Sequence, residues 1–116
     1  MRQGVAMFGL VVRFDLEEGS AEGFDRLVGE TAPLIRSQEP GTLIYACHAV
    51  QGEPSTRIFY ELYRDREAFE EHERQPHVKR FLAEREQYFA GPPRVEWLSF
   101  QGGKGVPAAA AAASRS

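Results

Sequence analysis

Two of the three histidines in the chain, His72 and His77, lie close together in the charged stretch EEHERQPHVKRF (70–81). Imidazole transfers protons near neutral pH and is also a common metal ligand. A zinc-binding HExxH helix needs two histidines four residues apart, whereas this stretch reads HExxxH and is interrupted by Pro76. On a helix, five residues turn through about 500°, so the two rings would leave in different directions. The spacing argues against a metal site and leaves each histidine as a candidate base.

Pro76 separates the two histidines structurally. Proline is favoured at the first position of a helix, so Pro76 is expected to end one helix and begin another, with His77 second. At a helix start the dipole disfavours imidazolium, which leaves a neutral ring able to accept a proton. His72 follows Phe69 by three residues and is expected on the apolar side of the preceding helix. A structural hydrogen bond at the helix break is the alternative role for each ring.

The other reactive side chains and motifs predict no cofactor chemistry. Cys47 and His48 are neighbours in a strand-like segment, so their side chains point to opposite faces and cannot form a catalytic dyad. We interpret Cys47 as a small core residue. The sequence contains no GxSxG elbow, no GxGxxG and no P-loop. We therefore expect neither a metal nor a cofactor.

The composition is that of an ordinary globular domain. The chain has 116 residues, 42% hydrophobic and 27% charged, with a formal net charge of −3. This balance lacks the basic face that nucleic-acid binding needs, and no apolar run reaches the length of a membrane span. With one cysteine and no signal-peptide pattern, we expect a cytoplasmic protein. Residues 1–101 are predicted to form one domain, and the Gly/Ala-rich residues 102–116 a flexible tail.

The hydrophobic periodicity predicts the order βαββαβ. Strands are expected at 5–14, 42–50, 56–63 and 94–100, where β-branched and aromatic residues gather. One helix precedes the EPG turn at 39–41, and a second begins after Asp65 and restarts at Pro76. This order is typical of a ferredoxin-like α+β fold, a four-stranded antiparallel sheet with its helices on one face.

The strands are apolar on both faces, which predicts a homodimer. In the strand 56–63 we expect one set of side chains to face the helices: Ile58, Tyr60 and Leu62. The opposite set, Phe59, Glu61 and Tyr63, would then need a cover that only a second copy can supply. Glu61 between two aromatics is either a satisfied polar contact at that interface or a site carboxylate lining a small cavity between the sheets.

The segments FYELYRDREAFEEHERQPHVKRF (59–81) and EPGTLIYAC (39–47) resemble the antibiotic biosynthesis monooxygenase (ABM) family. The resemblance covers roughly residues 5–100, its most specific element is the HxxxPH segment, and it is strongest to the quinol monooxygenase and autoinducer-processing branch. It implies a dimeric α+β barrel with a pocket between sheet and helices in each protomer. It also implies an oxygenase that uses neither metal nor flavin, because a small aromatic or quinol-like substrate itself reduces O₂.

The same resemblance implies the site residues. Its catalytic candidates are His72, His77 and Glu61, of which one histidine would take the substrate proton. Its substrate-binding candidates are Tyr63, Tyr45 and Phe59. The haem-degrading branch of the family carries Asn, Trp and His at positions that hold other residues in this chain, so haem degradation is not expected. Those positions are Val12, Tyr63 and Leu82.

Two other functions remain open at this point. One is an isomerase or degrading enzyme for a small oxygenated metabolite, including a phosphorylated one. Such an enzyme needs a basic residue in its pocket, and Arg57 and Lys79 are the candidates. The other is a non-catalytic dimeric module that binds a small ligand or acts in a stress response.

Overall fold

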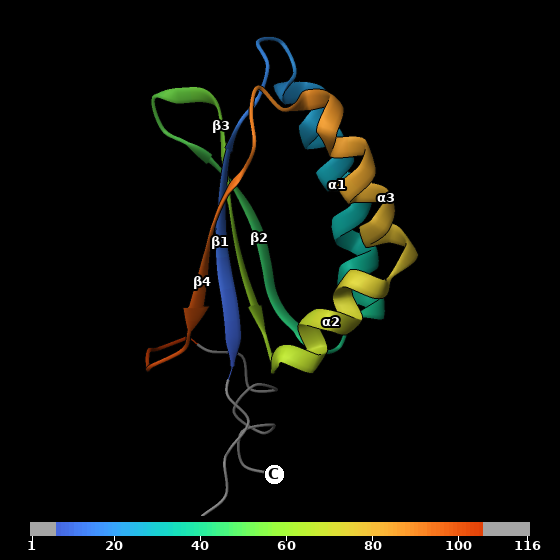
Figure 1. Cartoon of the computed structure of the whole chain (residues 1–116), viewed down its shortest axis with the longest axis vertical. Helices are drawn as coiled ribbons and strands as arrows, with labels where there is room; N and C mark the ends of the chain where they lie inside the picture. The colour runs from blue at the N-terminus through green and yellow to red at the C-terminus, as the bar shows by residue number, and fades with distance from the viewer. Residues whose placement is uncertain (1–6, 106–116) are drawn as a thin grey trace, which may run out of the picture.

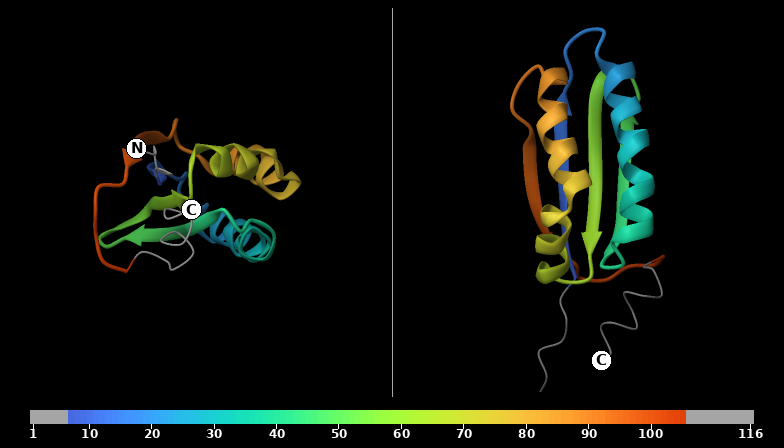
Figure 2. Two further views of the ribbon diagram at one scale, coloured as in Figure 1. Left: turned by 90° about the horizontal axis from the view of Figure 1, so that it is seen from below. Right: turned by 90° about the vertical axis from the view of Figure 1, so that its right-hand side faces the viewer.

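The computed structural model describes residues 7–105, which form one antiparallel sheet covered by helices on a single face (Figures 1 and 2). The strand order is β2-β3-β1-β4. This arrangement confirms the predicted ferredoxin-like α+β fold. The C-terminal part of the predicted tail, 106–116, lies outside the described residues. The elements are β1 (Phe8–Asp15), α1 (Ala21–Gln38), β2 (Thr42–Val50), β3 (Glu53–Tyr63), α2 (Arg66–Arg74), α3 (Pro76–Glu84), the 3₁₀ helix η1 (Arg85–Tyr88) and β4 (Arg94–Ser99).

The predicted helix break at Pro76 is confirmed. Gln75 has an extended backbone (φ −69°, ψ 137°), as the residue before a proline prefers, and Pro76 then occupies the first turn of α3. At the other end of α2, the side chain of Asp65 accepts a hydrogen bond from the backbone N–H of Ala68 at 2.8 Å. No helix within residues 7–105 is long and apolar enough to cross a membrane.

The turn between β2 and β3 is tighter than the sequence predicts. We expected β3 to begin at residue 56, but it begins at Glu53 and includes Pro54. Gly52 in the turn has a φ of +83°, a conformation that glycine adopts without steric cost. β2 and β3 thus form a long antiparallel hairpin at one edge of the sheet (Figure 2).

The prediction for the two faces of β3 is wrong. Phe59, Glu61 and Tyr63 are only 2%, 8% and 0% exposed, and Phe59 and Tyr63 belong to the core between sheet and helices. Cross-strand pairing decides the face, because Leu10 lies opposite Glu61 and pairs with it in register. The set that we expected to face the helices therefore lies on the outer face: Ile58, Tyr60 and Leu62. Aromatic bulk fills the core, and the carboxyl of Glu61 is accommodated by a local hydrogen bond described below.

Candidate active site

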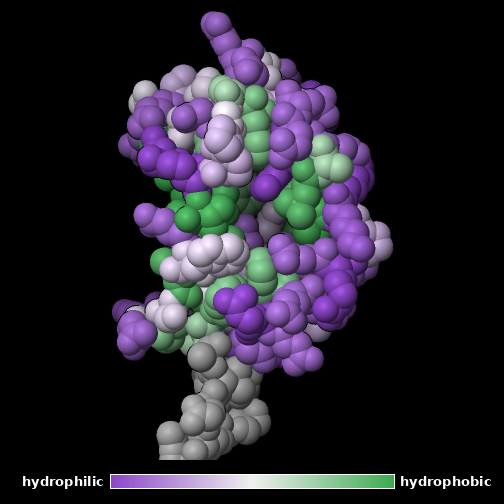
Figure 3. All heavy atoms as spheres, in the orientation of Figure 1, coloured by the Kyte–Doolittle hydropathy of each residue, from purple (hydrophilic) through white to green (hydrophobic). Residues whose placement is uncertain are grey.

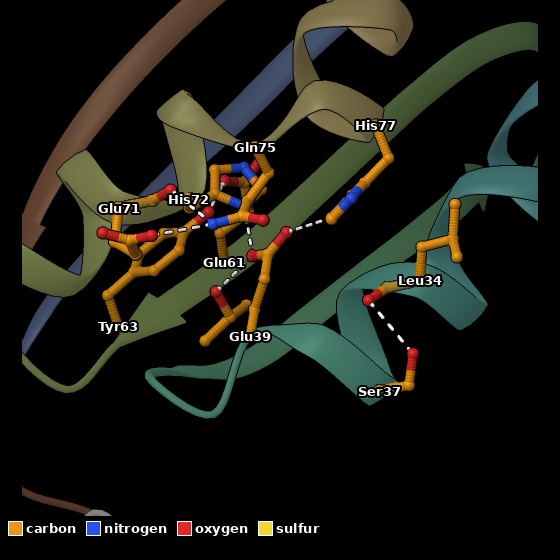
Figure 4. A network of polar contacts seen from close by, with 10 residues as sticks. Leu34, Ser37, Glu39, Glu61, Tyr63, Glu71, His72, Gln75 and His77 are labelled. Carbon is orange, nitrogen blue, oxygen red and sulfur yellow. Dashed lines mark hydrogen bonds and ion pairs between the residues drawn. The ribbon is translucent and has the colours of Figure 1, made fainter.

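The two histidines converge on one carboxylate, that of Glu39 (Figure 4). His72 Nδ1 lies 2.6 Å from Glu39 Oε1, and His77 Nε2 lies 2.5 Å from Glu39 Oε2. Thr42 Oγ1 donates a further hydrogen bond to Oε1 at 2.7 Å. The side chains of Glu39, His72 and His77 are 2%, 6% and 8% exposed. The end of α1, the end of α2 and the start of α3 thus meet at a buried polar cluster.

The charge of Glu39 fixes the tautomers of both rings. Burial raises the pKa of this carboxyl. Its pKa is lowered by hydrogen bonds from His72 and Thr42, by the charge of His72 and by a hydrogen bond from His77. Together these lowering effects outweigh burial, so the pKa of Glu39 lies below its ordinary value. An ionised carboxylate can only accept hydrogen bonds, so each imidazole carries a proton on the nitrogen that faces it. On a neutral His72 ring, Nε2 is then left as an acceptor. A carboxylate that orients a histidine in this way is a common means of positioning a general base.

A mainly apolar cavity of about 140 Å³ lies beside His72, between the sheet and the helices. Figure 3 shows apolar side chains on either side of a hollow between the sheet edge and the helices. Trp97, on the edge strand β4, is 58% exposed and also lines this cavity. The apolar walls come from β1, β4, α2 and α3, and include Leu10, Val12, Phe69, Val78 and Phe81. The polar groups of the lining are Tyr45, Glu61, His72, Glu73 and Arg85.

Glu61 is a second buried carboxyl in this pocket. Tyr63 Oη donates a hydrogen bond to Glu61 Oε1 at 2.5 Å. Burial raises the pKa of Glu61 and outweighs the lowering effects of Tyr63, His72 and Arg85. Burial and the neighbouring Glu61 also raise the pKa of Tyr63, which therefore stays a phenol. The pocket favours the protonated form of Glu61 more than water does.

The structure distributes the predicted site residues between the pocket wall and the layer behind it. His72, Glu61 and Tyr45 line the cavity. His77 contacts the second carboxylate oxygen of Glu39 and does not line the cavity. Tyr63 lies next to Glu61 in the core, with its ring centroid 5.2 Å from that of His72. Phe59 is core and packs edge-on against Tyr45, with 5.2 Å between ring centroids.

Sequence reasoning missed two residues of the site, Glu39 and Arg85. Glu39 drew attention only as part of the turn after the first helix. It is the C-cap of α1, where the helix dipole disfavours a negative charge, so an acidic residue at this position was a usable signal for a specific partner. Of the expected basic residues, Arg57 is paired with Asp25 at 2.9 Å and Lys79 is exposed on α3, and neither lines the pocket. Arg85 is the arginine that does.

Cys47 and the metal-binding residue types add no further reactive centre to the described part of the chain. Cys47 packs against the core, and burial raises the pKa of its thiol to about 11. It therefore stays a thiol at neutral pH. Within residues 7–105, no group of three or more His, Cys, Asp or Glu side chains is arranged to hold a metal ion.

The fold and the pocket define a small ferredoxin-like protein with a mainly apolar cavity between its sheet and its helices. The sequence model of the family "Antibiotic biosynthesis monooxygenase" matches residues 7–84. The chain belongs to the ABM family. No curated protein is significantly similar to it in sequence.

Solved structures share the fold at low sequence identity. A protein from Caulobacter crescentus CB15, provisionally named an antibiotic biosynthesis monooxygenase, is 24% identical with a TM-score of 0.80, over 84% of this chain and 92% of its own. The protein PA3566 from Pseudomonas aeruginosa is 22% identical with a TM-score of 0.76, over 87% of this chain and 100% of its own. Rv0793 from Mycobacterium tuberculosis is 20% identical with a TM-score of 0.76, over 84% and 98%. At these identities the likeness establishes the fold alone.

Proposed function

We propose that this protein is a cofactor-independent monooxygenase of the quinol monooxygenase branch, which oxidises a small quinol or polyphenol with O₂. One observation supports this proposal most strongly. His72 lies on the wall of an apolar pocket, and the buried carboxylate of Glu39 orients its ring. His72 Nε2 takes the phenolic proton, and Glu39 stabilises the imidazolium that forms. His77, on the second oxygen of Glu39, holds that carboxylate in place.

The reaction needs only a base and a dry cage, because the phenolate itself reduces O₂. One electron passes from the phenolate to O₂, and the two radicals combine at a ring carbon. Loss of water then leaves a quinone. Overall, one phenolic C–OH and one ring C–H become two carbonyl groups. One atom of O₂ becomes the new carbonyl oxygen, and the other leaves as water. The apolar walls exclude bulk water from the radical pair, and Tyr45 and Glu61 are polar contacts for the ring oxygens.

Oxygen uptake tests this proposal. Metal-stripped protein is given reduced quinones and phenols in an oxygen-electrode cell, and uptake above the rate without protein is expected for part of the panel. His72→Gln should lower the rate about 100-fold, whereas His48→Gln, at an exposed position of β2, should leave it unchanged. Uptake at the background rate across the panel would overturn the proposal. Product without uptake would favour an isomerase, and binding without turnover a ligand-binding module.

We also infer that the protein works as a homodimer through the outer face of the sheet. This face carries apolar side chains that are only half-buried in the protomer, among them Val11, Ile44, Ile58, Tyr60 and Leu98. A patch of this kind on a sheet is a common protein interface. Light scattering of the wild-type protein should give twice the mass of the 13.0 kDa chain. For Tyr60→Glu the measured mass should fall to that of a single chain. A wild-type monomer at micromolar concentration would contradict the inference.

A further inference from the structure

Arg85 is a cation on the wall of the pocket that no side chain of the described protein neutralises. It begins η1 at the end of α3 and lines the same cavity as His72 and Glu61. Its Nε is the only buried side-chain nitrogen or oxygen in residues 7–105 without a hydrogen-bond partner. No carboxylate within these residues lies within ion-pair distance of it. A guanidinium placed in this way is costly unless something else supplies its acceptors.

The carboxylates around Arg85 are committed elsewhere or point away. Glu84, its neighbour in the chain, accepts a hydrogen bond from Arg80 at 2.7 Å. Glu86, on the other side, is exposed to solvent. Glu61, in the same pocket, is hydrogen-bonded to Tyr63. The electrostatic influence of Glu61 and Glu86 reaches Arg85 without a direct contact.

Packing explains where Arg85 sits but not why its N–H groups are unused. The guanidinium carbon lies 5.2 Å from the ring centroid of Phe89 and 5.8 Å from that of Phe81. Cation–π contacts of this kind use the face of the guanidinium. A position at the C-terminus of α3 also favours a positive charge. Both interactions leave the in-plane N–H donors available, and those donors fit the two oxygens of a carboxylate.

From this geometry we propose that the pocket selects aromatic substrates that carry a carboxylate, and that Arg85 is the residue that recognises it. The carboxylate sits against Arg85, the ring lies along the apolar wall that includes Trp97, and the reacting hydroxyl faces His72. The cavity of about 140 Å³ is close to the roughly 150 Å³ that holds a benzene ring. This proposal rests on the proposed function in taking the pocket beside His72 as the substrate site. What it adds is that the substrate carries a negative charge.

Benzoate and benzamide test the charge preference without any oxidation. They have nearly the same size, they differ in charge, and neither reduces O₂. Because Trp97 is the only tryptophan and lines the cavity, its fluorescence reports binding there. For the full-length wild-type protein at pH 7, we expect benzoate to bind about tenfold more tightly than benzamide. The preference should disappear in Arg85→Gln and persist in part in Arg85→Lys, which keeps the charge but not the planar fork.

Arg80→Gln is the matched control. Arg80 lies five residues away on α3, is exposed, pairs with Glu30 and Glu84, and does not line the pocket, so this variant should keep the full preference. Equal affinity of the wild-type protein for the two probes would overturn the proposal, as would a preference that survives Arg85→Gln. These results are independent of oxygen uptake. A preference for benzoate without oxygen uptake would support the carboxylate site and contradict the monooxygenase activity. Oxygen uptake with neutral quinols alone would support the activity and contradict the carboxylate site.

Discussion

Two buried carboxyl groups, Glu39 and Glu61, lie close to the same imidazole, that of His72 (Figure 4). Their pKa values nevertheless move in opposite directions. Both are almost fully buried. Glu39 is held by His72, His77 and Thr42, so its pKa is lowered. Within residues 7–105 Glu61 is hydrogen-bonded only to Tyr63, and burial raises its pKa. The additional donors and the charge of His72 account for the lowered pKa of Glu39.

The difference assigns separate tasks to the two groups. An ionised Glu39 can accept hydrogen bonds on both oxygens, which suits a residue that orients a base and stabilises its charged form. A carboxyl with a raised pKa, such as that of Glu61, keeps its proton to a higher pH than a free carboxyl does, and in that form it can donate a hydrogen bond to an oxygen in the pocket. The neighbours of each carboxyl thus give the two groups different properties around one histidine.

The largest effect should come from neutralising Glu39. In Glu39→Gln, an amide replaces the charged acceptor, and its NH₂ group faces an imidazole N–H. Breaking a buried charged network by changing one partner costs about 3 kcal/mol. We expect the free energy of unfolding at pH 7, measured in urea, to fall by about this amount. In the oxygen-uptake assay kcat should fall more than KM changes, because Glu39 does not line the cavity and would act on a substrate only through His72.

Glu61→Gln is the matched variant for that measurement, since it replaces the other buried carboxyl by the same amide. If both variants destabilise the protein to the same extent, the donors around Glu39 do not set it apart. That result would refute the comparison.

The next effect concerns the one donor to Glu61. Tyr63→Phe keeps the aromatic packing but leaves the buried carboxyl without a hydrogen-bond partner among residues 7–105. An unsatisfied buried polar group costs about 2 kcal/mol, and we expect the free energy of unfolding to fall by that amount. In the double variant with Glu61→Leu the two changes should not be additive, because each of them removes the same hydrogen bond. Full additivity would show that the bond contributes nothing.

The element order could be predicted because its signals are local. Pro76 and the capping Asp65 mark helix ends in any context, and runs of β-branched and aromatic residues mark where the strands lie. The face of β3 could not be predicted in this way, because both of its alternating sets are apolar. Its pairing with β1, which sets Leu10 opposite Glu61, depends on residues about fifty positions away.

The site was partly predictable for the same reason. His72 and His77 stand out by residue type and spacing, and their separation by Pro76 is a local feature. Their common partner is not local, because Glu39 precedes His72 by 33 residues and His77 by 38. Arg85 sits among other charged residues in a helix, and only the structure distinguishes it from the paired arginines around it.

The two carboxyls should also give opposite dependences of stability on pH. Glu39, with a lowered pKa, contributes stability that is present above its unfolded value near 4.5 and is lost as the pH falls through the lower folded value. Glu61, with a raised pKa, contributes stability that is full below its unfolded value and is lost as the pH rises through the higher folded value.

Glu61→Gln should therefore stabilise the protein at pH 7, on the order of 1 kcal/mol, by removing a carboxyl whose ionisation is penalised by burial. This gain should shrink as the pH falls from 7 towards about 4.5, whereas the deficit of Glu39→Gln should shrink only below about 4.5. Urea unfolding between pH 3 and 8 separates the two curves. Parallel curves for the two variants would mean that the groups titrate alike.

The smallest effect should follow loss of one donor among several. Thr42→Val removes the hydroxyl that donates to Glu39 Oε1 and leaves both imidazoles in place. Because His72 still donates to that oxygen, we expect a loss of only about 0.5 kcal/mol in urea unfolding. This loss of stability should be several times smaller than that of Tyr63→Phe, although each variant removes one hydroxyl group that donates a hydrogen bond to a buried carboxyl. If Thr42→Val costs as much as Tyr63→Phe, the hydrogen bonds from the two histidines do not hold the charge of Glu39.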